Sequence, residues 1–564
     1  MMLDRYNKWK SANLPEHLMN ELNEISTNAK EIKDRFYQYL SFGTGGMRGL
    51  LGAGTNRMNI YTIRRVAEGL ARYIDLNGEE AKQRGVVIAY DTRNFSYEFA
   101  VETARVLGAH SITAYVFKEP RPTPHLSFSV RELHAFAGVV ITASHNPKQY
   151  NGFKIYGEDG AQLVPSGANI IMEQMDTIQD VFEISVHDEK ELEAQGLFNW
   201  ILEELDTKYL QNLQTLKENN ELNTELKIVY TPLHGAGLVP VTRGLKEFGF
   251  NHVYLVDQQA IKDGSFPTVP YPNPEESAAF ELAMEKGNEV GADLLLATDP
   301  DADRLGVAVR NGNRYELLTG NQLGALLLHY ILQTKQSNDT LPPNGIMVKT
   351  IVTSELGTKI ANHFNVATEN TLTGFKYIAE KIEEYEKLKQ HAFLFGYEES
   401  YGYLIKTFVR DKDAVQVALK VAEMAGYYSL KGQTLIDALN ELYLNFGYHK
   451  EALVSKVFEG KDGQEQMTAI LNGYRENPPT EISGVPIVKV EDYLKGVVTF
   501  SNGTTEPIQL PKENVIKFIL EDESWVAIRP SGTEPKCKYY FGVVAKTQQD
   551  AGTRIEQMIK AIVE

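Results

Sequence analysis

Three apolar segments of the chain, each with the composition of a buried strand, end in polar loops that carry reactive side chains. They read VVITASHNP (139–147), LLLATDPDADR (294–304) and AFLFGYEES (392–400). Apolar runs bounded by turn residues are typical of strands covered on both faces, and in open α/β sheets ligands gather beyond the carboxyl ends of such strands. Helix-patterned segments alternate with these and other strand-like segments, which predicts βαβ units.

The length of 564 residues exceeds what one hydrophobic core organises and predicts about four domains. The polar loops recur at Ser144, Asp299 and Glu398, roughly 155 and 100 residues apart. This spacing indicates three related α/β domains with mixed, largely parallel sheets, although strands that end in polar loops also arise by chance. A Pro-rich stretch and short strands after residue 455 predict a smaller α+β C-terminal domain. We expect the loops to surround a central cleft, with domains over 1–205 (beginning with a helical extension), 206–320, 321–455 and 456–564.

The composition limits the classes of partner. The net charge of −18, from 57 Lys+Arg and 75 Asp+Glu, disfavours a general nucleic-acid or anionic-membrane binder, and an anionic small substrate would need a locally basic site. The first residues lack the apolar region of a secretory signal, so we expect none, and the longest apolar stretch, 323–332, is too short to span a bilayer. The single cysteine, Cys537, fits a structural role in a reducing compartment. We therefore expect a cytoplasmic protein with no obligate protein partner evident.

The segment DPDADR places three carboxylates, Asp299, Asp301 and Asp303, on the same side of an extended backbone. Such a set suits a hard divalent cation, and Mg²⁺ commonly combines carboxylates with a phosphate oxygen. An EF-hand calcium loop is excluded, because Arg304 and Arg310 stand where its Gly and Glu would be. The alternative is a solvated acidic turn.

Two further segments have the composition of anion or polyol sites. RPSGTEPK (529–536) combines an arginine and a lysine with turn residues whose backbone N–H groups and hydroxyls can hold a phosphate, although alone it also fits an ordinary turn. GYEES offers carboxylates to sugar hydroxyls, or is a plain charged loop. FGTGGMRG (42–49) is Gly-rich but has neither the ending of a nucleotide P-loop nor a GxGxxG pattern.

Taken together, these segments resemble the α-D-phosphohexomutases and, within them, the phosphoglucomutases. The likeness runs from Phe42 to Lys536 with the motifs in the family's order. It implies three α/β domains and a C-terminal domain around a shared cleft. TASHNP is similar to the family's phosphoserine loop, DPDADR to its magnesium loop, GYEES to its sugar-binding loop and RPSGTEPK to its phosphate clamp.

The resemblance also implies roles for single residues. Ser144 would carry the phosphoryl group and, with Asp299, Asp301 and Asp303, hold Mg²⁺. Cations around the phosphoserine would be Arg48, Lys154 and Arg304, and Lys376 in LTGFK matches a position proposed for proton transfer. His145 is a rival base or else a hydrogen-bonded structural histidine. The substrate would be held at its sugar hydroxyls by Glu398 and Ser400, and at its non-reacting phosphate by Arg529, Ser531, Gly532, Thr533 and Lys536.

The implied reaction interconverts glucose 1-phosphate and glucose 6-phosphate through a phosphoserine, with glucose 1,6-bisphosphate as intermediate and activator. Two departures leave the sugar open: Gly45 stands where many relatives carry Ser, and GYEESYGY lacks the His of the phosphomannomutase-like pattern. The alternatives are phosphopentomutase, phosphomannomutase or sugar-bisphosphate synthase activity. Outside the family, the rivals are a metal-dependent phosphatase with an Asp nucleophile and a non-catalytic sugar-phosphate-binding protein.

Overall fold

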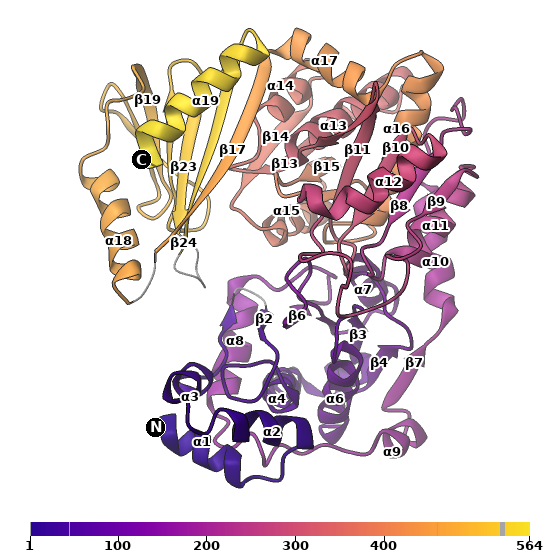
Figure 1. Cartoon of the computed structure of the whole chain (residues 1–564), viewed down its shortest axis with the longest axis vertical. Helices are drawn as coiled ribbons and strands as arrows, with labels where there is room; N and C mark the ends of the chain where they lie inside the picture. Colours follow the sequence, from indigo (N-terminus) through magenta and orange to yellow (C-terminus); the bar gives the residue numbers. More distant parts are fainter. Residues whose placement is uncertain (1, 44–45, 459–460, 531–535, 564) are drawn as a thin grey trace. The chain divides into compact units, whose positions relative to one another are not determined.

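The computed structural model describes residues 2–43, 46–458, 461–530 and 536–563, whose strands form four principal sheets (Figure 1). The chain divides into two compact units. Unit 1 comprises Met1–Gly320, Ala379–Phe395 and Ser400–Gly432, and unit 2 comprises Asn321–Ile378, Gly396–Glu399 and Gln433–Glu564. The chain therefore enters each unit more than once, and the four boundaries expected from the sequence stay a prediction.

The first sheet has parallel strands at one side and antiparallel strands at the other, in the order β1-β2-β6-β5-β3-β4-β7. Strands β5, β3, β4 and β7 run parallel, and β6, β2 and β1 add antiparallel pairs. The bounds are β1 (Phe42–Gly43), β2 (Gly46–Leu50), β3 (Val86–Tyr90), β4 (Ala114–Phe117), β5 (Ala137–Ile141), β6 (Tyr150–Tyr156) and β7 (Phe198–Ile201).

Helices cover both faces of this sheet, because alternate residues of β3 enter different cores. Val86 and Ile88 pack with α4 (Ile60–Leu76), α6 (Ser96–Ala109) and α8 (Pro165–Asp176), whereas Val87 and Ala89 pack with α7 (Thr123–Glu132) and α10 (Glu203–Gln214). The shorter helices α5 (Gly78–Arg84) and α9 (Glu189–Ala194) complete the layers. Two buried faces explain the continuous apolar strand sequences.

The expected N-terminal helical extension is present as α1 (Met2–Ser11), α2 (Glu16–Glu24) and α3 (Ala29–Phe36). Its helices share an aromatic core in which the buried Trp9 contacts the rings of Phe36, Tyr61 and Phe182. Because Tyr61 belongs to α4, this core fixes the extension to the first sheet's domain.

The second sheet has the order β12-β11-β10-β8-β9, with β8 parallel to β10 and β9 and with β11 and β12 antiparallel. The bounds are β8 (Ile228–Thr231), β9 (Val253–Leu255), β10 (Leu294–Thr298), β11 (Leu305–Asn311) and β12 (Arg314–Leu318). Its helices are α11 (Leu238–Glu247), α12 (Glu281–Val290) and the short 3₁₀ helix η1 (Ser277–Phe280). A helix from much later in the chain, α16 (Ala414–Leu430), packs on α11.

The third sheet has the order β14-β13-β15-β16, with β13 (Gly345–Thr350) parallel to β14 (Ala367–Thr371). Its other strands are β15 (Ala392–Tyr397) and β16 (Tyr403–Leu404). The neighbouring helices are α13 (Gly320–Ser337), α14 (Leu356–His363), α15 (Phe375–Leu388) and α17 (Leu435–Phe446).

The C-terminal sheet is antiparallel, in the order β17-β24-β23-β22-β19-β20-β21, with β18 (Glu481–Ile482) beside β19. The strands are β17 (Tyr448–Val457), β19 (Val485–Asp492), β20 (Val497–Phe500), β21 (Thr505–Pro507), β22 (Ile516–Leu520), β23 (Trp525–Pro530) and β24 (Lys536–Ala545), and the helices are α18 (Lys461–Glu476) and α19 (Gln548–Val563). The predicted α+β C-terminal domain is confirmed, and Cys537 is buried within its core as expected.

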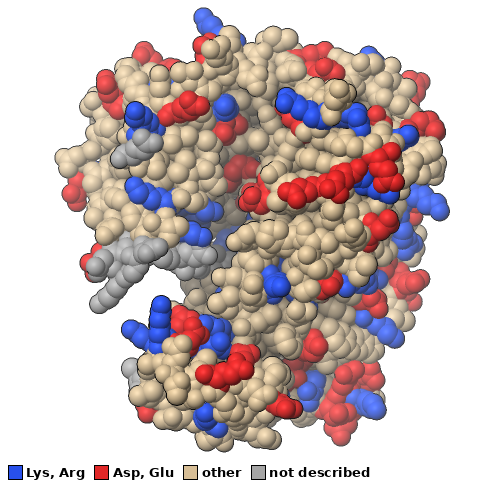
Figure 2. Space-filling model, in the orientation of Figure 1, with Lys and Arg blue, Asp and Glu red and all other residues tan. Residues whose placement is uncertain are grey.

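None of the described helices is long and apolar enough to cross a membrane. On the face drawn in Figure 2, Lys and Arg side chains are interspersed with Asp and Glu and do not form one continuous basic field.

Candidate active site

Ser144 lies in the loop after β5, as the sequence predicts, and its backbone is left-handed with φ of 51°. The hydroxyl of Thr142 accepts a hydrogen bond from the Ser144 N–H at 2.8 Å. The Ser144 Oγ donates to Asp299 Oδ2 at 2.6 Å and lies 3.1 Å from His145 Nδ1. The serine hydroxyl is therefore aimed at the acidic loop of the second sheet.

The three aspartates follow β10 and fold into one cluster, with a ligand oxygen of each within 4.8 Å of the others. Asp299 Oδ1 accepts the backbone N–H groups of Asp303 and Arg304, which closes the turn. The side chains are 0%, 0% and 2% exposed for Asp299, Asp301 and Asp303. The alternative of a solvated acidic turn is therefore wrong.

Two carboxylate oxygens of this cluster, Asp301 Oδ1 and Asp303 Oδ1, are buried and have no hydrogen-bond partner among the described residues. Unpartnered buried acceptors are costly. A small hard cation satisfies them, and oxygen ligands of this kind are those that Mg²⁺ prefers. The donor set thus fits the predicted metal.

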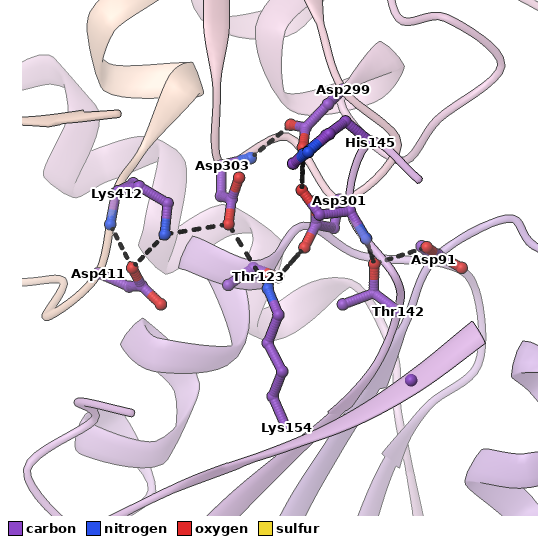
Figure 3. Close-up of polar contacts among 12 residues, drawn as sticks. Asp91, Thr123, Thr142, His145, Lys154, Asp299, Asp301, Asp303, Asp411 and Lys412 are labelled. Atoms are coloured by element: carbon purple, nitrogen blue, oxygen red, sulfur yellow. Dashed lines mark hydrogen bonds and ion pairs between the residues drawn. The ribbon is translucent and has the colours of Figure 1, made fainter. Parts of the chain in front are cut away.

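The surroundings shift the pKa values of two of the aspartates in opposite directions. Burial, together with the carboxylates of Asp301 and Asp303, raises the pKa of Asp299 well above its ordinary value. Burial would also raise the pKa of Asp303, but the ammonium groups of Lys412 and Lys154 lower it below the ordinary value. The negative charge of the cluster is therefore partly compensated by lysines (Figure 3).

The cations predicted around the phosphoserine are brought to the same place by the first sheet. Lys154 on β6 lies 3.2 Å from Asp301 Oδ2 and 3.6 Å from Asp303 Oδ2. Arg48, on the adjacent β2, donates to the Asn146 side chain at 3.1 Å. Strand β6 can pass this close to the serine loop because Gly152 has no side chain. A Cβ at this position would lie only 2.5 Å from the Thr142 carbonyl oxygen.

Arg304 follows directly on the acidic loop and pairs with Glu275. Its backbone forms an antiparallel bridge with Gly402. The guanidinium Nε also lies 3.9 Å from Asp303 Oδ1. The predicted residues thus gather at one centre in unit 1, in which the aspartates and the serine are buried, three members are half-buried and one is exposed. The buried members are Ser144, Asp299, Asp301 and Asp303, the half-buried ones are His145, Lys154 and Arg304, and the exposed one is Arg48.

For His145 the sequence is compatible with either a base or a structural histidine. Burial, reinforced by the charges of Arg304 and Arg48, lowers its pKa well below the ordinary value. A neutral imidazole in contact with Ser144 Oγ is compatible with both the structural and the proton-transfer interpretation.

The structure adds partners that the sequence analysis missed. Lys412 lies 3.2 Å from Asp303 Oδ2 and 2.9 Å from Asp411 Oδ1, and Tyr156 donates to Asp411 Oδ2 at 2.7 Å. The Thr123 hydroxyl donates to Asp301 Oδ2 at 2.8 Å (Figure 3). The charged stretch RDKD before an apolar helical pattern was the available signal for Lys412.

The candidate sugar loop follows β15, and its carboxylates are hydrogen-bonded within unit 2. Glu398, which is 7% exposed, accepts the Gly374 N–H at 3.0 Å, two residues before the buried Lys376. Glu399 Oε2 accepts from the hydroxyls of Thr350 and Thr353, each at 3.2 Å. Ser400 belongs to unit 1.

The candidate phosphate clamp is described in part. Arg529 is the last but one residue of β23 and donates through Nε to Glu513 Oε1 at 2.8 Å. Although burial opposes it, the charges of Glu513 and Tyr540 raise the arginine's pKa further. Lys536 begins β24, while Ser531, Gly532 and Thr533, like Gly45 of the Gly-rich turn, lie outside the described residues.

Three family descriptions match the chain in order. They are phosphoglucomutase/phosphomannomutase alpha/beta/alpha domain I over residues 39–181, domain II over 207–312 and domain III over 319–446. A protein of Staphylococcus aureus (strain bovine RF122 / ET3-1) named phosphoglucomutase is 40% identical over 532 residues, covering 94% of this chain and 94% of that protein. Another from S. aureus strain USA300 is 39% identical over 549 residues, covering 97% and 96%.

Solved structures share the fold at low identity. The open form of parafusin (phosphoglucomutase) from Paramecium superposes with a TM-score of 0.68 at 16% identity, covering 93% of this chain and 95% of that one. A phosphoglucomutase/phosphomannomutase family protein from Burkholderia thailandensis gives a TM-score of 0.67 at 16% identity, covering 92% and 96%.

Proposed function

Because this chain belongs to the phosphoglucomutase/phosphomannomutase family, we propose that it interconverts glucose 1-phosphate and glucose 6-phosphate through a phosphorylated Ser144. The observation that carries the proposal is the 2.6 Å contact between Ser144 Oγ and Asp299, in a cluster of buried carboxylates that Lys154 contacts. Relatives at 40% identity over nearly the whole chain support the same reaction.

A phosphoserine relays a group that one sugar cannot pass directly between its own hydroxyls. The free hydroxyl of a sugar monophosphate attacks phosphorus, the bond from phosphorus to Ser144 Oγ breaks, and a bisphosphate forms. After this intermediate turns over, the Ser144 hydroxyl takes its other phosphoryl group and releases the isomeric monophosphate. The reaction consumes no co-substrate, because one phosphoryl group leaves Ser144 and another returns to it. Glucose 1,6-bisphosphate activates unphosphorylated enzyme.

The chain's own groups neutralise and position the phosphoryl group. Lys154 and Arg48 lie beside the serine loop, and Arg304 flanks the acidic turn. Phosphoryl transfer depends mainly on such positioning and charge compensation. Asp299, Asp301 and Asp303, with an oxygen on Ser144, would hold Mg²⁺, which when bound supplies further positive charge to the transferring group.

A base must accept the proton of the attacking hydroxyl, and three side chains are candidates. Lys154 and His145 lie at the Ser144 centre, and Lys376 follows two residues after Gly374, which contacts the candidate sugar loop. The charges around each candidate set its pKa, and the pKa decides whether the group is unprotonated at neutral pH and can act as the base.

Substrate recognition is assigned to the remaining predicted residues. Glu398 and Ser400 would read ring hydroxyls, and Arg529, Lys536 and the intervening turn with Ser531, Gly532 and Thr533 would hold the non-reacting phosphate. The partner is a small sugar phosphate, with no role for nucleic acid or membrane, and we expect the reaction to take place in the cytoplasm.

The test compares kcat/KM for glucose 1-phosphate, mannose 1-phosphate and ribose 1-phosphate with Mg²⁺ and glucose 1,6-bisphosphate present. We expect glucose 1-phosphate to be preferred, because a site that hydrogen-bonds hydroxyls penalises a substrate lacking them. A preference of about tenfold or more for ribose 1-phosphate would favour a phosphopentomutase. Release of inorganic phosphate without isomerisation would instead support a phosphatase.

A further inference from the structure

A buried ion pair after β3, between Asp91 and Arg93, lies directly behind the serine loop. Both side chains are 0% exposed, and Arg93 Nε lies 3.2 Å from Asp91 Oδ2. A buried ion pair is a poor source of stability by itself, because both charges lose their hydration. The contacts that Asp91 and Arg93 make with the serine loop indicate a role besides stability.

The Arg93 guanidinium donates to four backbone carbonyls, three in the serine loop and one at the start of β6. Its NH1 group donates to the oxygens of Pro147 at 2.9 Å and Tyr150 at 3.2 Å, and its NH2 group donates to those of Ser144 and Asn146. Carbonyls in an irregular buried loop need such donors, and the rigid guanidinium fork can serve several at once.

Asp91 holds the same loop from the other side. Its Oδ2 accepts the Thr142 hydroxyl at 2.7 Å, and that hydroxyl accepts the Ser144 N–H at 2.8 Å. The carbonyl of Ser144 is bound by Arg93, so the ion pair holds the backbone of Ser144 from both ends. This residue has a left-handed backbone, which costs a non-glycine residue about 1 kcal/mol or more.

The domain that carries the acidic loop supplies a third contact. The buried ring of Phe266, between β9 and η1, has its centroid 4.9 Å from the Arg93 guanidinium. Nearby, a Cβ on Gly264 would lie 2.4 Å from the Asn94 nitrogen, so this segment packs directly on the chain at Arg93. Arg93 thus joins the serine loop to the domain of Asp299.

We propose that Arg93 is a positioning residue for phosphoryl transfer, which fixes the backbone of Ser144 so that its Oγ faces Asp299. It acts through Ser144 and takes no part in substrate binding. The inference rests on the proposed phosphoserine mechanism. A misplacement of about 1 Å can cost roughly 100-fold in rate, so the contacts of one buried side chain can matter this much.

The test replaces Arg93 by lysine, which keeps the positive charge but cannot reach four carbonyls. Unphosphorylated enzyme is mixed with glucose 1,6-bisphosphate, and the rate at which Ser144 gains phosphate is followed by quenched-flow mass spectrometry. We expect Arg93→Lys to lower this rate and kcat by about 100-fold. The KM for glucose 1-phosphate should change by less than about threefold, because the variant leaves the binding groups in place.

Arg310→Lys is the matched control. Arg310 also donates to backbone carbonyls, those of Ala292 at 2.8 Å and Gly287 at 3.3 Å, and lies 4.8 Å from the Tyr315 ring centroid. Its loss should lower the melting temperature without slowing phosphate uptake. An equal loss of rate in both variants, or a folded Arg93→Lys enzyme with near-wild-type uptake, would overturn the positioning role.

If Arg93→Lys does not fold, Phe266→Leu tests the same contact more gently. It keeps an apolar side chain but removes the ring face, and uptake should slow by roughly three- to tenfold; unchanged uptake in this variant would overturn the proposal. Wild-type enzyme that takes no phosphate on Ser144 would refute the phosphoserine function itself, which separates the two failures.

Discussion

The Ser144 centre in unit 1 and the Arg529 region in unit 2 hold their charged groups in different ways. Asp299 and Asp301 are 0% exposed, and Ser144 is 3% exposed. Arg529 and its partner Glu513 keep side-chain exposures of 30% and 22%. The serine and the aspartates are buried and hydrogen-bonded, whereas Arg529 has a carboxylate partner and access to water.

This difference suits the two tasks of the proposed reaction, which are stabilising the transition state and binding the non-reacting phosphate. Groups that stabilise a transition state work best when they are fixed before the reaction, so that no reorganisation is needed. A group that binds the non-reacting phosphate must release it twice in each catalytic cycle, because the bisphosphate has to turn over. An arginine that exchanges one anionic partner for another is suited to this second task.

The largest effect is expected from removing the carrier hydroxyl. Ser144→Ala should lower kcat by about 10⁴-fold or more, because the phosphoryl group has no other acceptor. Mutase assays with a coupled dehydrogenase measure this, with the exposed Ser26→Ala as control. Near-wild-type turnover in the Ser144 variant would contradict the distinction between the two regions.

The next effect concerns the carboxylate cluster. Asp301→Asn, or chelation of divalent metal, should reduce kcat by roughly a thousandfold, since a bound cation supplies several kcal/mol of charge stabilisation. Titration with Mg²⁺ should restore the chelated wild type. Asp339→Asn, at an exposed position whose left-handed φ of 54° suits asparagine, is the control. Full activity in excess chelator would show that the cluster needs no metal.

A smaller effect is expected in unit 2. Arg529→Ala should raise the KM for glucose 1-phosphate by about thirtyfold, or about 2 kcal/mol, the low end for losing a charged partner, because the side chain is part-exposed. Arg554→Ala, in the same sheet domain but paired with Asp522, is the control and should leave KM unchanged. A fall in kcat with KM unchanged would assign Arg529 to the chemistry instead.

The smallest effect is expected from changing Glu513, the carboxylate partner that Arg529 would exchange for a substrate phosphate. Glu513→Gln keeps the shape of the side chain but removes the charge that competes with a substrate phosphate. Because this pair is part-exposed, its interaction is worth at most about 1 kcal/mol, and KM should fall by about two- to fivefold. A tenfold rise in KM would show that Glu513 mainly orients Arg529.

The sequence identified the two loops that meet at the Ser144 centre because each motif is contiguous. TASHNP and DPDADR both follow buried strands, and the sheets place their reactive residues together. The three α/β sheets and the C-terminal α+β domain were predicted as well. The fold class follows from strand and helix alternation, which local sequence records.

The sequence did not reveal contacts between distant segments. Arg93 reads as a turn residue, and its role depends on carbonyls more than fifty positions later. Lys412 lies in a charged stretch that fits a helix start, yet it contacts Asp303 across more than a hundred residues. For the same reason the pattern of α16 showed an apolar helix but not that it packs on α11.

The most direct test of the phosphoserine centre is where phosphate resides on the protein. Wild-type and Ser144→Ala enzymes are treated with glucose 1,6-bisphosphate, and the intact and peptide masses are measured. We predict one phosphate per wild-type chain, located on Ser144, and none on the variant. A wild-type enzyme that turns over glucose 1-phosphate without phosphate on Ser144, or with phosphate on Asp299, would contradict the mechanism.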